Sequence, residues 1–319
     1  MPVRTLLVAV GAALALAAAA HSQSQTPSGP APAQRSAPVA VPAGEKELRT
    51  QVLLDRAGFS VGEIDGKAGS NTSRAMAVYE KERVGGAAVA QAGLHALSTD
   101  NAPTLIDYTL TAEDVKGPFV KVPQDMMAKA KLETLGYSSP AEKLGEKFHA
   151  SPALIKSLNP GKRLDRAGET IRVPNVRSEI TGKAAKIVVD RSDGSVSALD
   201  AQDKVLARYP ATMGSEHDPL PLGTWKVTGV QRNPPFNYNP DLFWDAKATH
   251  SKTKIAPGPN NPVGVVWIDL SKEHYGIHGT PEPAQIGKTE SHGCIRLTNW
   301  DAADLAKMVS PGVVAVLQE

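Results

Sequence analysis

The sequence of 319 residues contains a single cysteine, Cys294. One thiol cannot form a disulfide within its own chain, which excludes a scaffold held together by disulfides. Aromatic residues make up only 5% of the chain, and the net charge is only +2, with lysine and arginine spread along its length. Since no basic stripe with interleaved aromatics is present, the sequence predicts no nucleic-acid partner.

Long hydrophobic runs are also missing beyond the N-terminus. Residues 1–20 carry an early positive charge at Arg4, followed by an alanine-rich apolar run from Leu6 to Ala20. This run is short and weakly hydrophobic for a membrane span, and it is typical of a cleavable secretory signal peptide, with an uncleaved anchor as the alternative. The sequence therefore predicts export to the periplasm or cell envelope, with no membrane span after the signal is cleaved.

Residues 21–44 are rich in proline, alanine, serine and glutamine and are almost uncharged. Such a composition cannot bury a core, so it predicts an extended linker. The 275 residues that follow have room for two or three domains.

Residues 45–97 are predicted to form a small helical domain. Leu48, Val52 and Leu53 fall on one helical face, and a second helix follows a turn-rich stretch. The order helix, Asp-Gly turn, helix resembles the three-helix peptidoglycan-binding domain found on bacterial wall enzymes; an ordinary helical hairpin is the alternative. The matching residues are Gln51, Leu54, Gly58, Phe59, Ile64, Asp65, Gly66, Gly69, Thr72, Ala75, Tyr79 and Glu80.

Residues 98–131 are predicted to connect this domain to the next, with a strand near Ile106 and a short helix starting at Pro123. Residues 132–176 follow with two helices, which Ser139 and Ser151 are expected to cap, and a short strand at 171–174. This segment resembles a LysM module, a glycan-binding fold, although the usual opening strand and Gly-Asp-Thr turn are absent or disguised. It is either a glycan-binding module or a structural spacer.

The pattern changes to β from Lys183 onward. Short alternating or apolar runs are separated by turns of glycine, proline, asparagine and aspartate, which predicts a mainly β sandwich or barrel-like domain over 183–318 with one helix at 299–309. The expected strands cover 186–190, 195–199, 205–212, 224–230, 263–270, 276–278, 294–298 and 313–317. The whole chain is thus predicted to be multidomain.

The stretch 232–262 is long, rich in proline and aromatic. Loops of this length are uncommon unless they bind or cover something. Tyr238, Phe243 and Trp244 either line a pocket there or pack the loop down.

The residues around Cys294 bear on its role, since a lone cysteine is a buried inert thiol, an intermolecular link or a nucleophile. A cysteine nucleophile needs a base. His292 lies two residues before Cys294 and would point to the same side of an extended strand. His278 ends another strand-like run, and a loop over 280–290 can set it directly across from Cys294.

Gly293 and Arg296 complete this constellation. Gly293 leaves room for an incoming carbonyl, and the amides of Gly293 and Cys294 are free to donate to an oxyanion. One such donor is typically worth about 3 kcal/mol of barrier. Arg296 is expected on the same face as Cys294, where it can hold a substrate carboxylate through two hydrogen bonds.

The sequences "IHGT" at 277–280 and "SHGCIRL" at 291–297 match, with their spacing, the signature of YkuD-type L,D-transpeptidases. The flanking pieces agree, and the resemblance covers 183–318: "PLGTWKV" at 221–227, "PGPNNPVGVVWIDLS" at 257–271 and "HYGIHG" at 274–279. It implies a cysteine acyltransferase that acts on peptidoglycan stem peptides and is acylated by carbapenems. No metal or organic cofactor is implied.

The resemblance also implies a role for each residue of the site. Cys294 attacks the bond between diaminopimelate and the terminal D-alanine of a tetrapeptide stem, and His278 transfers the proton. The carbonyl of Gly279 orients His278, and Gly293 supplies an oxyanion amide. The substrate-binding residues are Ser291, His292 and Arg296. The amine of a second stem then attacks the thioester and forms a 3→3 cross-link.

Alternatives stay open for the acceptor and for the class of protein. The acceptor can be water, as in a carboxypeptidase or cross-link hydrolase, or a lysine of an envelope protein. A non-catalytic wall-anchoring protein would need only the binding modules. A zinc peptidase is disfavoured, because Gly276 and a strand-like context interrupt the His274–His278 pair and no glutamate follows His274.

Overall fold

The computed structural model describes residues 44–84, 97, 99–177 and 180–319, and all of them belong to one compact unit. The predicted signal peptide over 1–20 and nearly all of the linker over 21–44 lie outside the described residues. Among the residues that are described, no helix is both long and apolar enough to cross a bilayer.

The N-terminal part contains the two expected helices, α1 (Glu45–Arg56) and α2 (Ser70–Val84). Gln51 joins α1 to the turn between them, because its side-chain oxygen accepts hydrogen bonds from the backbone of Asp65 at 3.1 Å and Gly66 at 2.8 Å. Phe59, in the loop after α1, packs edge to face against Tyr79 of α2, with ring centroids 5.2 Å apart. A polar side chain thus holds the turn, and aromatic packing holds the helices.

A small α+β element follows, and it differs from the sequence interpretation. Strand β1 (Leu105–Thr109) pairs antiparallel with β2 (Thr170–Pro174), with helices α5 (Pro140–Lys147) and α6 (Pro152–Leu158) between them in the chain. The strand expected near Ile106 is therefore confirmed as β1. It was assigned to a connecting segment, but it pairs with β2 across the insertion that precedes α5.

The helix expected from Pro123 is reduced to a single turn within this insertion. Helix α4 (Met126–Lys129) begins after Asp125, whose carboxylate caps the amides of Met127 and Ala128. The two other expected caps are confirmed: Ser139 accepts from the backbone of Glu142, and Ser151 accepts from that of Leu154.

The C-terminal part is a nine-stranded sheet in the order β5-β4-β3-β13-β7-β10-β11-β12-β6. Its long strand β7 pairs with β13 through its first half and with β10 through its second half. The sheet folds around one core, so this part is mainly β and barrel-like. The strands are β3 (Lys186–Asp190), β4 (Ser195–Leu199), β5 (Val205–Pro210), β6 (Thr212–Met213), β7 (Gly223–Arg232), β10 (Val266–Leu270), β11 (Gly276–His278), β12 (Ile295–Arg296) and β13 (Val314–Gln318).

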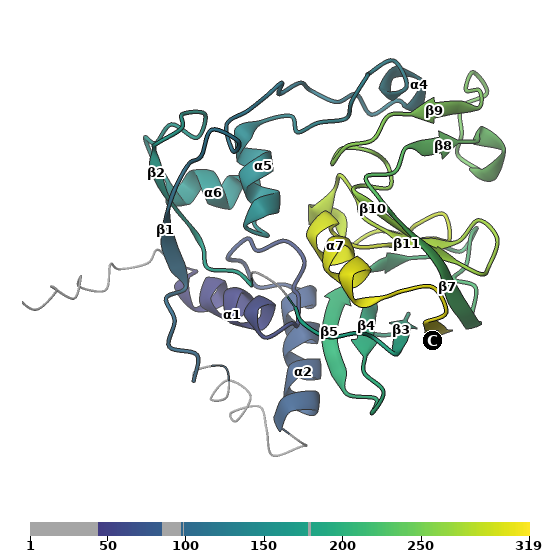
Figure 1. The fold of residues 1–319 in the computed structure, drawn as a ribbon, viewed down its shortest axis with the longest axis horizontal. Coiled ribbons are helices and arrows are strands. Elements are labelled where there is room, and N and C mark those ends of the chain that lie inside the picture. Colours follow the sequence, from purple (N-terminus) through teal and green to yellow (C-terminus); the bar gives the residue numbers. More distant parts are fainter. Residues whose placement is uncertain (1–43, 85–96, 98, 178–179) are drawn as a thin grey trace, which may run out of the picture. The chain divides into compact units, whose positions relative to one another are not determined.

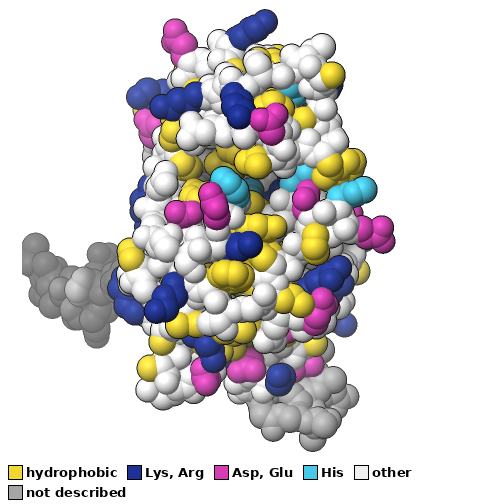
Figure 2. Space-filling view, turned by 90° about the vertical axis from the view of Figure 1, so that its right-hand side faces the viewer, with side chains coloured by type: hydrophobic (Ala, Val, Ile, Leu, Met, Phe, Trp, Pro, Cys, Tyr) yellow, Lys and Arg dark blue, Asp and Glu magenta, His cyan; other side chains and the backbone are white. Residues whose placement is uncertain are grey.

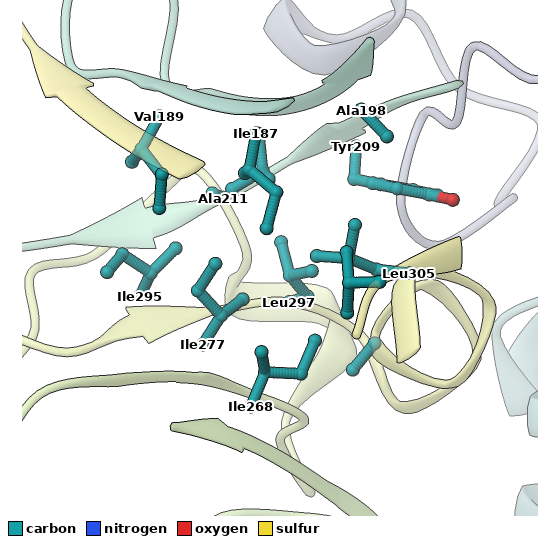
Figure 3. Packing of buried hydrophobic residues seen from close by; sticks show 14 of the residues in the cluster. Ile187, Val189, Ala198, Tyr209, Ala211, Ile268, Ile277, Ile295, Leu297 and Leu305 are labelled. Carbon is teal, nitrogen blue, oxygen red and sulfur yellow. The ribbon is translucent and has the colours of Figure 1, made fainter. Parts of the chain in front are cut away.

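The core of this part lies between the two halves of the sheet and helix α7 (Asn299–Met308), which lies beside the strands in Figure 1. Figure 3 shows Ile187 and Tyr209 from one half facing Ile268 and Ile277 from the other, with Leu305 of α7 beside them. Burial of such side chains stabilises the fold by roughly 1.5–3 kcal/mol each. The predicted helix at 299–309 is confirmed, and Thr298 caps it by accepting from the backbone of Asp301.

The stretch 232–262 contains a short hairpin of β8 (Phe236–Tyr238) and β9 (Thr253–Ile255), with a 3-10 turn at Pro240–Leu242. Tyr238 and Ile255 pack against Leu135 of the insertion, and the carboxylate of Asp125 accepts from Lys247 at 2.8 Å. The insertion between β1 and α5 therefore braces this hairpin. A second 3-10 turn, Pro283–Gln285, lies in the loop between β11 and β12.

Candidate active site

The site is built at the junction of β11 and β12, two neighbouring parallel strands. Their register pairs Ile277 with Ile295 and His278 with Arg296. Cys294 lies one position before β12, so its parallel counterpart is Gly276 and not His278. The expectation that His278 lies directly across from Cys294 is wrong. In the parallel register His278 lies across from Arg296, which is two residues after Cys294.

His278 is buried, with 4% of its surface exposed. Its Nδ1 donates to the carbonyl of Gly279 at 2.7 Å, since a carbonyl can only accept. The neutral ring therefore carries its proton on Nδ1 and leaves Nε2 as a base. Burial, with a smaller effect of the nearby Arg296 charge, lowers the pKa of His278 to about 3, against the opposing effect of the Gly279 hydrogen bond.

Cys294 is partly buried, and its Sγ contacts the carbonyl oxygen of His274 at 3.6 Å. Burial raises the pKa of the thiol, while the amide of Gly276 and the charge of Arg296 act in the opposite direction. The lowered pKa of His278 and the raised pKa of Cys294 both favour the neutral thiol and neutral imidazole over an ion pair in the free protein.

Gly293 has a backbone conformation that favours glycine, with φ at +88°. A Cβ at this position would also come within 2.8 Å of the Tyr275 ring, so no larger residue fits without a shift. Ser291 stabilises the turn before Cys294 through two hydrogen bonds. Its amide donates to the carbonyl of Gly214 at 3.0 Å, and its hydroxyl donates to the carbonyl of Cys294 at 2.6 Å.

The positive φ of Gly293 interrupts the backbone between His292 and Cys294, so the extended strand expected there is not formed. The His292 ring contacts the 232–262 stretch. Its Nε2 lies 2.8 Å from the carboxylate of Asp245, and its ring packs edge-on against Phe243 at 5.0 Å. Trp244 lies beside His292 and is 60% exposed. Figure 2 shows histidine side chains grouped with acidic and hydrophobic ones on this side of the molecule.

Arg296 is half-buried on β12, and its charge acts on both Cys294 and His278. Within the described part of the chain, its guanidinium forms no hydrogen bond and no ion pair with another side chain. Burial lowers the pKa of Arg296, with the charges of Cys294, Glu282 and Asp245 acting against that effect. A guanidinium without a partner at such a site has its donors available for an anion.

The structure adds residues that the sequence analysis did not single out for the site. Tyr275 contacts Gly293, and burial raises the pKa of Tyr275, with Cys294 adding to the effect. Trp267 stacks on His278 from the neighbouring strand β10. Both lie within the flanking pieces of the resemblance, but their contacts with His278 and Gly293 arise only when the chain folds. Among the described residues, no group of three His, Cys, Asp or Glu could hold a metal ion.

Comparison with known proteins finds a family match over the residues that contain this site. Residues 184–317 match the family model of the YkuD L,D-transpeptidase catalytic domain. The chain is 30% identical to the putative L,D-transpeptidase YkuD of Bacillus licheniformis, over 54% of this chain and 88% of that protein. It is 43% identical to a putative L,D-transpeptidase of Fuscovulum blasticum, over 51% of this chain and 85% of that protein.

A similar solved structure is an L,D-transpeptidase from Mycobacterium smegmatis. The identity is 19% and the TM-score is 0.35, with 51% of this chain and 79% of that chain covered.

Proposed function

Because the chain belongs to the YkuD family of L,D-transpeptidases, we propose that it acts on peptidoglycan with Cys294 as the nucleophile. The observation that carries this proposal is the buried His278 on the strand next to Cys294, with Nδ1 bound to Gly279. That hydrogen bond leaves Nε2 as the base. The donor substrate is a tetrapeptide stem, cut between diaminopimelate and the terminal D-alanine.

The first half-reaction forms a thioester. As Sγ of Cys294 attacks the carbonyl carbon, the thiol proton moves to Nε2 of His278. Proton transfer during the attack is consistent with a thiol and an imidazole that are both neutral in the free protein. The amides of Gly293 and Cys294 donate to the oxyanion of the tetrahedral intermediate. The carbon–nitrogen bond then breaks, and His278 returns the proton to the nitrogen of the leaving D-alanine.

The second half-reaction transfers the acyl group. The side-chain amine of another stem loses a proton to His278 and attacks the thioester carbonyl. The carbon–sulfur bond breaks, the thiol of Cys294 regains the proton, and a 3→3 cross-link remains. Water or an envelope-protein lysine would follow the same steps as acceptor. No step requires a metal or an organic cofactor.

Ser291, His292 and Arg296 would act around the substrate and not in the bond-making steps. Arg296 has its donors available for a stem carboxylate. Ser291 holds the Cys294 turn through its two hydrogen bonds. His292, in contact with Asp245 and Phe243, would form the wall between the site and the 232–262 stretch.

The segments before residue 183 would bring the enzyme to its polymer. Residues 45–97 would bind peptidoglycan, and 132–176 together with β1 would form the LysM-like module. A cavity of about 320 Å³ at β2 supports glycan binding there. Its lining combines polar and apolar side chains, which suits sugar hydroxyls and amides on one hand and sugar ring faces on the other: Asp107, Leu158, Asn159, Pro160, Lys162, Thr170, Ile171 and Arg172. Such substrates place the enzyme in the cell envelope after export.

The test is mass spectrometry of products after the mature protein is mixed with purified tetrapeptide muropeptides, beside Cys294→Ala. Tripeptide–tetrapeptide dimers with loss of D-alanine, absent from the variant, are expected. Released tripeptide without dimers would instead indicate a hydrolase or a missing protein acceptor. No turnover by either protein would favour a non-catalytic wall-anchoring protein.

A further inference from the structure

Helix α5, which lies outside the matched residues 184–317, presents two carboxylates to the catalytic part. Glu142 and Glu146 are one helical turn apart, so both project from the same face. Glu142 accepts from the side-chain amide of Asn260 at 2.6 Å, and Glu146 accepts from that of Asn299 at 2.6 Å. Helix α5 thus contacts α7 and the loop before β10 by two matched hydrogen bonds.

Asn299 is the first residue of α7 and is only 1% exposed. Its amide nitrogen also donates to the carbonyl of Pro259 at 3.0 Å, and its oxygen accepts from the backbone of Val265 at 3.2 Å. All the hydrogens of this amide are therefore used, and the side chain has one orientation.

The oxygen of Asn299 forms the wall behind Gly279. A Cβ placed on Gly279 would come within 2.3 Å of that oxygen, so the two groups are already in close contact. Gly279 is the residue whose carbonyl accepts from Nδ1 of His278. A change in the orientation of Asn299 would therefore move the peptide that holds the imidazole.

We propose that Glu146 is a positioning residue for the L,D-transpeptidase reaction, acting through Asn299 and Gly279 on the ring of His278. This rests on the proposed role of His278 as the base. Helix α5 then helps to position the catalytic histidine, in addition to any role of its segment in binding the polymer. Displacement of a reacting group by about 1 Å can cost on the order of 100-fold in rate.

Either protonation state of Glu146 can fill this role. Tyr137 lies 3.4 Å from its other oxygen, and burial raises the pKa of Glu146 to about 8. The protonated acid and the carboxylate both offer an oxygen to Asn299. Glu146→Gln keeps that acceptor, whereas Glu146→Ala removes it.

The experiment compares Glu146→Ala with Glu146→Gln and with Glu142→Ala in the full mature chain. Glu142→Ala is the matched control, because it removes the equivalent bond to Asn260 and also the contact with the amide of Ser138. The readouts are kcat and KM for D-alanine release, the thermal midpoint, and the NMR signal of the His278 Nδ1 proton.

Glu146→Ala is expected to lower kcat by roughly tenfold or more with little change in KM, and to speed exchange of the Nδ1 proton. Glu146→Gln should restore both, and Glu142→Ala should leave both near wild type. Unchanged kcat and NMR signal in Glu146→Ala would overturn the proposal, as would equal losses in Glu142→Ala.

Two further controls separate this proposal from the reaction itself. If wild type releases no D-alanine, the proposed function fails, while the Nδ1 signal still decides whether Glu146 positions His278. If Glu146→Ala does not fold, Asn299→Asp provides the test in its place. It keeps the oxygen that accepts from Val265, loses the amide donors to Glu146 and Pro259, and should lower kcat and speed exchange of the Nδ1 proton in the same way.

Discussion

The imidazole of His278 lies nearly flat against the indole of Trp267, with ring centroids 5.4 Å apart and planes 17° from parallel. The two residues are direct neighbours across β10 and β11. One face of the imidazole is thereby shielded from water, which contributes to the burial that lowers the pKa of His278. The same indole donates to the carboxylate of Asp269 at 3.2 Å, so its own orientation is held.

The lowered pKa of His278 predicts that the free energy of unfolding decreases as the pH falls. The unfolded histidine binds a proton below its ordinary value of 6.5, but the folded one binds it only near 3. Between these values the unfolded state holds more protons, so this histidine contributes a loss of about 1.4 kcal/mol of unfolding free energy per pH unit as the pH falls. Denaturant titrations from pH 7 to pH 4 should show a shallower decline for His278→Gln. Parallel curves for both proteins would contradict this prediction.

Replacement of Cys294 by serine should abolish turnover. A hydroxyl is a much weaker nucleophile than a thiol beside a neutral imidazole, so a loss on the order of 10³-fold or more is expected. Release of D-alanine from a tetrapeptide muropeptide measures it, and an unchanged thermal midpoint serves as the control for folding. Retained activity in Cys294→Ser would rule out the thiol mechanism.

Carbapenems should acylate the protein at Cys294. The strained lactam carbonyl presents the same kind of electrophile as the stem peptide, and ring opening keeps the whole drug attached. Intact-protein mass spectrometry should show one added drug mass in wild type and none in Cys294→Ala. An unmodified wild-type protein would count against the proposed site.

Gly293→Ala should lose both stability and activity. The positive φ alone costs about 1–2 kcal/mol for a residue with a side chain, and the new Cβ would also press on Tyr275. Gly312→Ala is the matched control, because Gly312 has a φ of +98° but open space around it. Chemical denaturation and D-alanine release should show the activity loss only in Gly293→Ala. Equal activity in the two variants would show that the contact with Tyr275 is unimportant.

Replacement of Arg296 by methionine should weaken substrate binding and change the titration of the site. Loss of charge-assisted hydrogen bonds to a carboxylate costs about 1.5–3 kcal/mol, which corresponds to roughly a 10- to 100-fold increase in KM. The charge of Arg296 lowers the pKa of both Cys294 and His278, so both pKa values should rise in the variant. Alkylation of Cys294 as a function of pH measures the first shift. A KM and a profile like those of wild type would exclude Arg296 from the site.

The local features of this protein follow from its sequence. Ser139, Ser151 and Thr298 cap helices because each is a hydroxyl residue before a helical run, and such bonds span only a few residues. The strands at 186–190 and 195–199 follow from alternation, with bounds that the structure reproduces. The two short motifs at 277–280 and 291–297 likewise identified the family, because each of them keeps its functional residues within a few adjacent positions.

The tertiary structure alone decided how distant segments meet. Strand β1 pairs with β2, which lies more than sixty residues later in the chain, and no local sequence pattern predicts this pairing. The parallel register that places His278 beside Arg296 depends on where β12 begins, and the backbone before Cys294 is not extended because of one positive φ at Gly293. Glu146 reaches Asn299 from 153 residues away, since a hydrogen bond between side chains requires proximity in space and leaves no periodicity in the sequence.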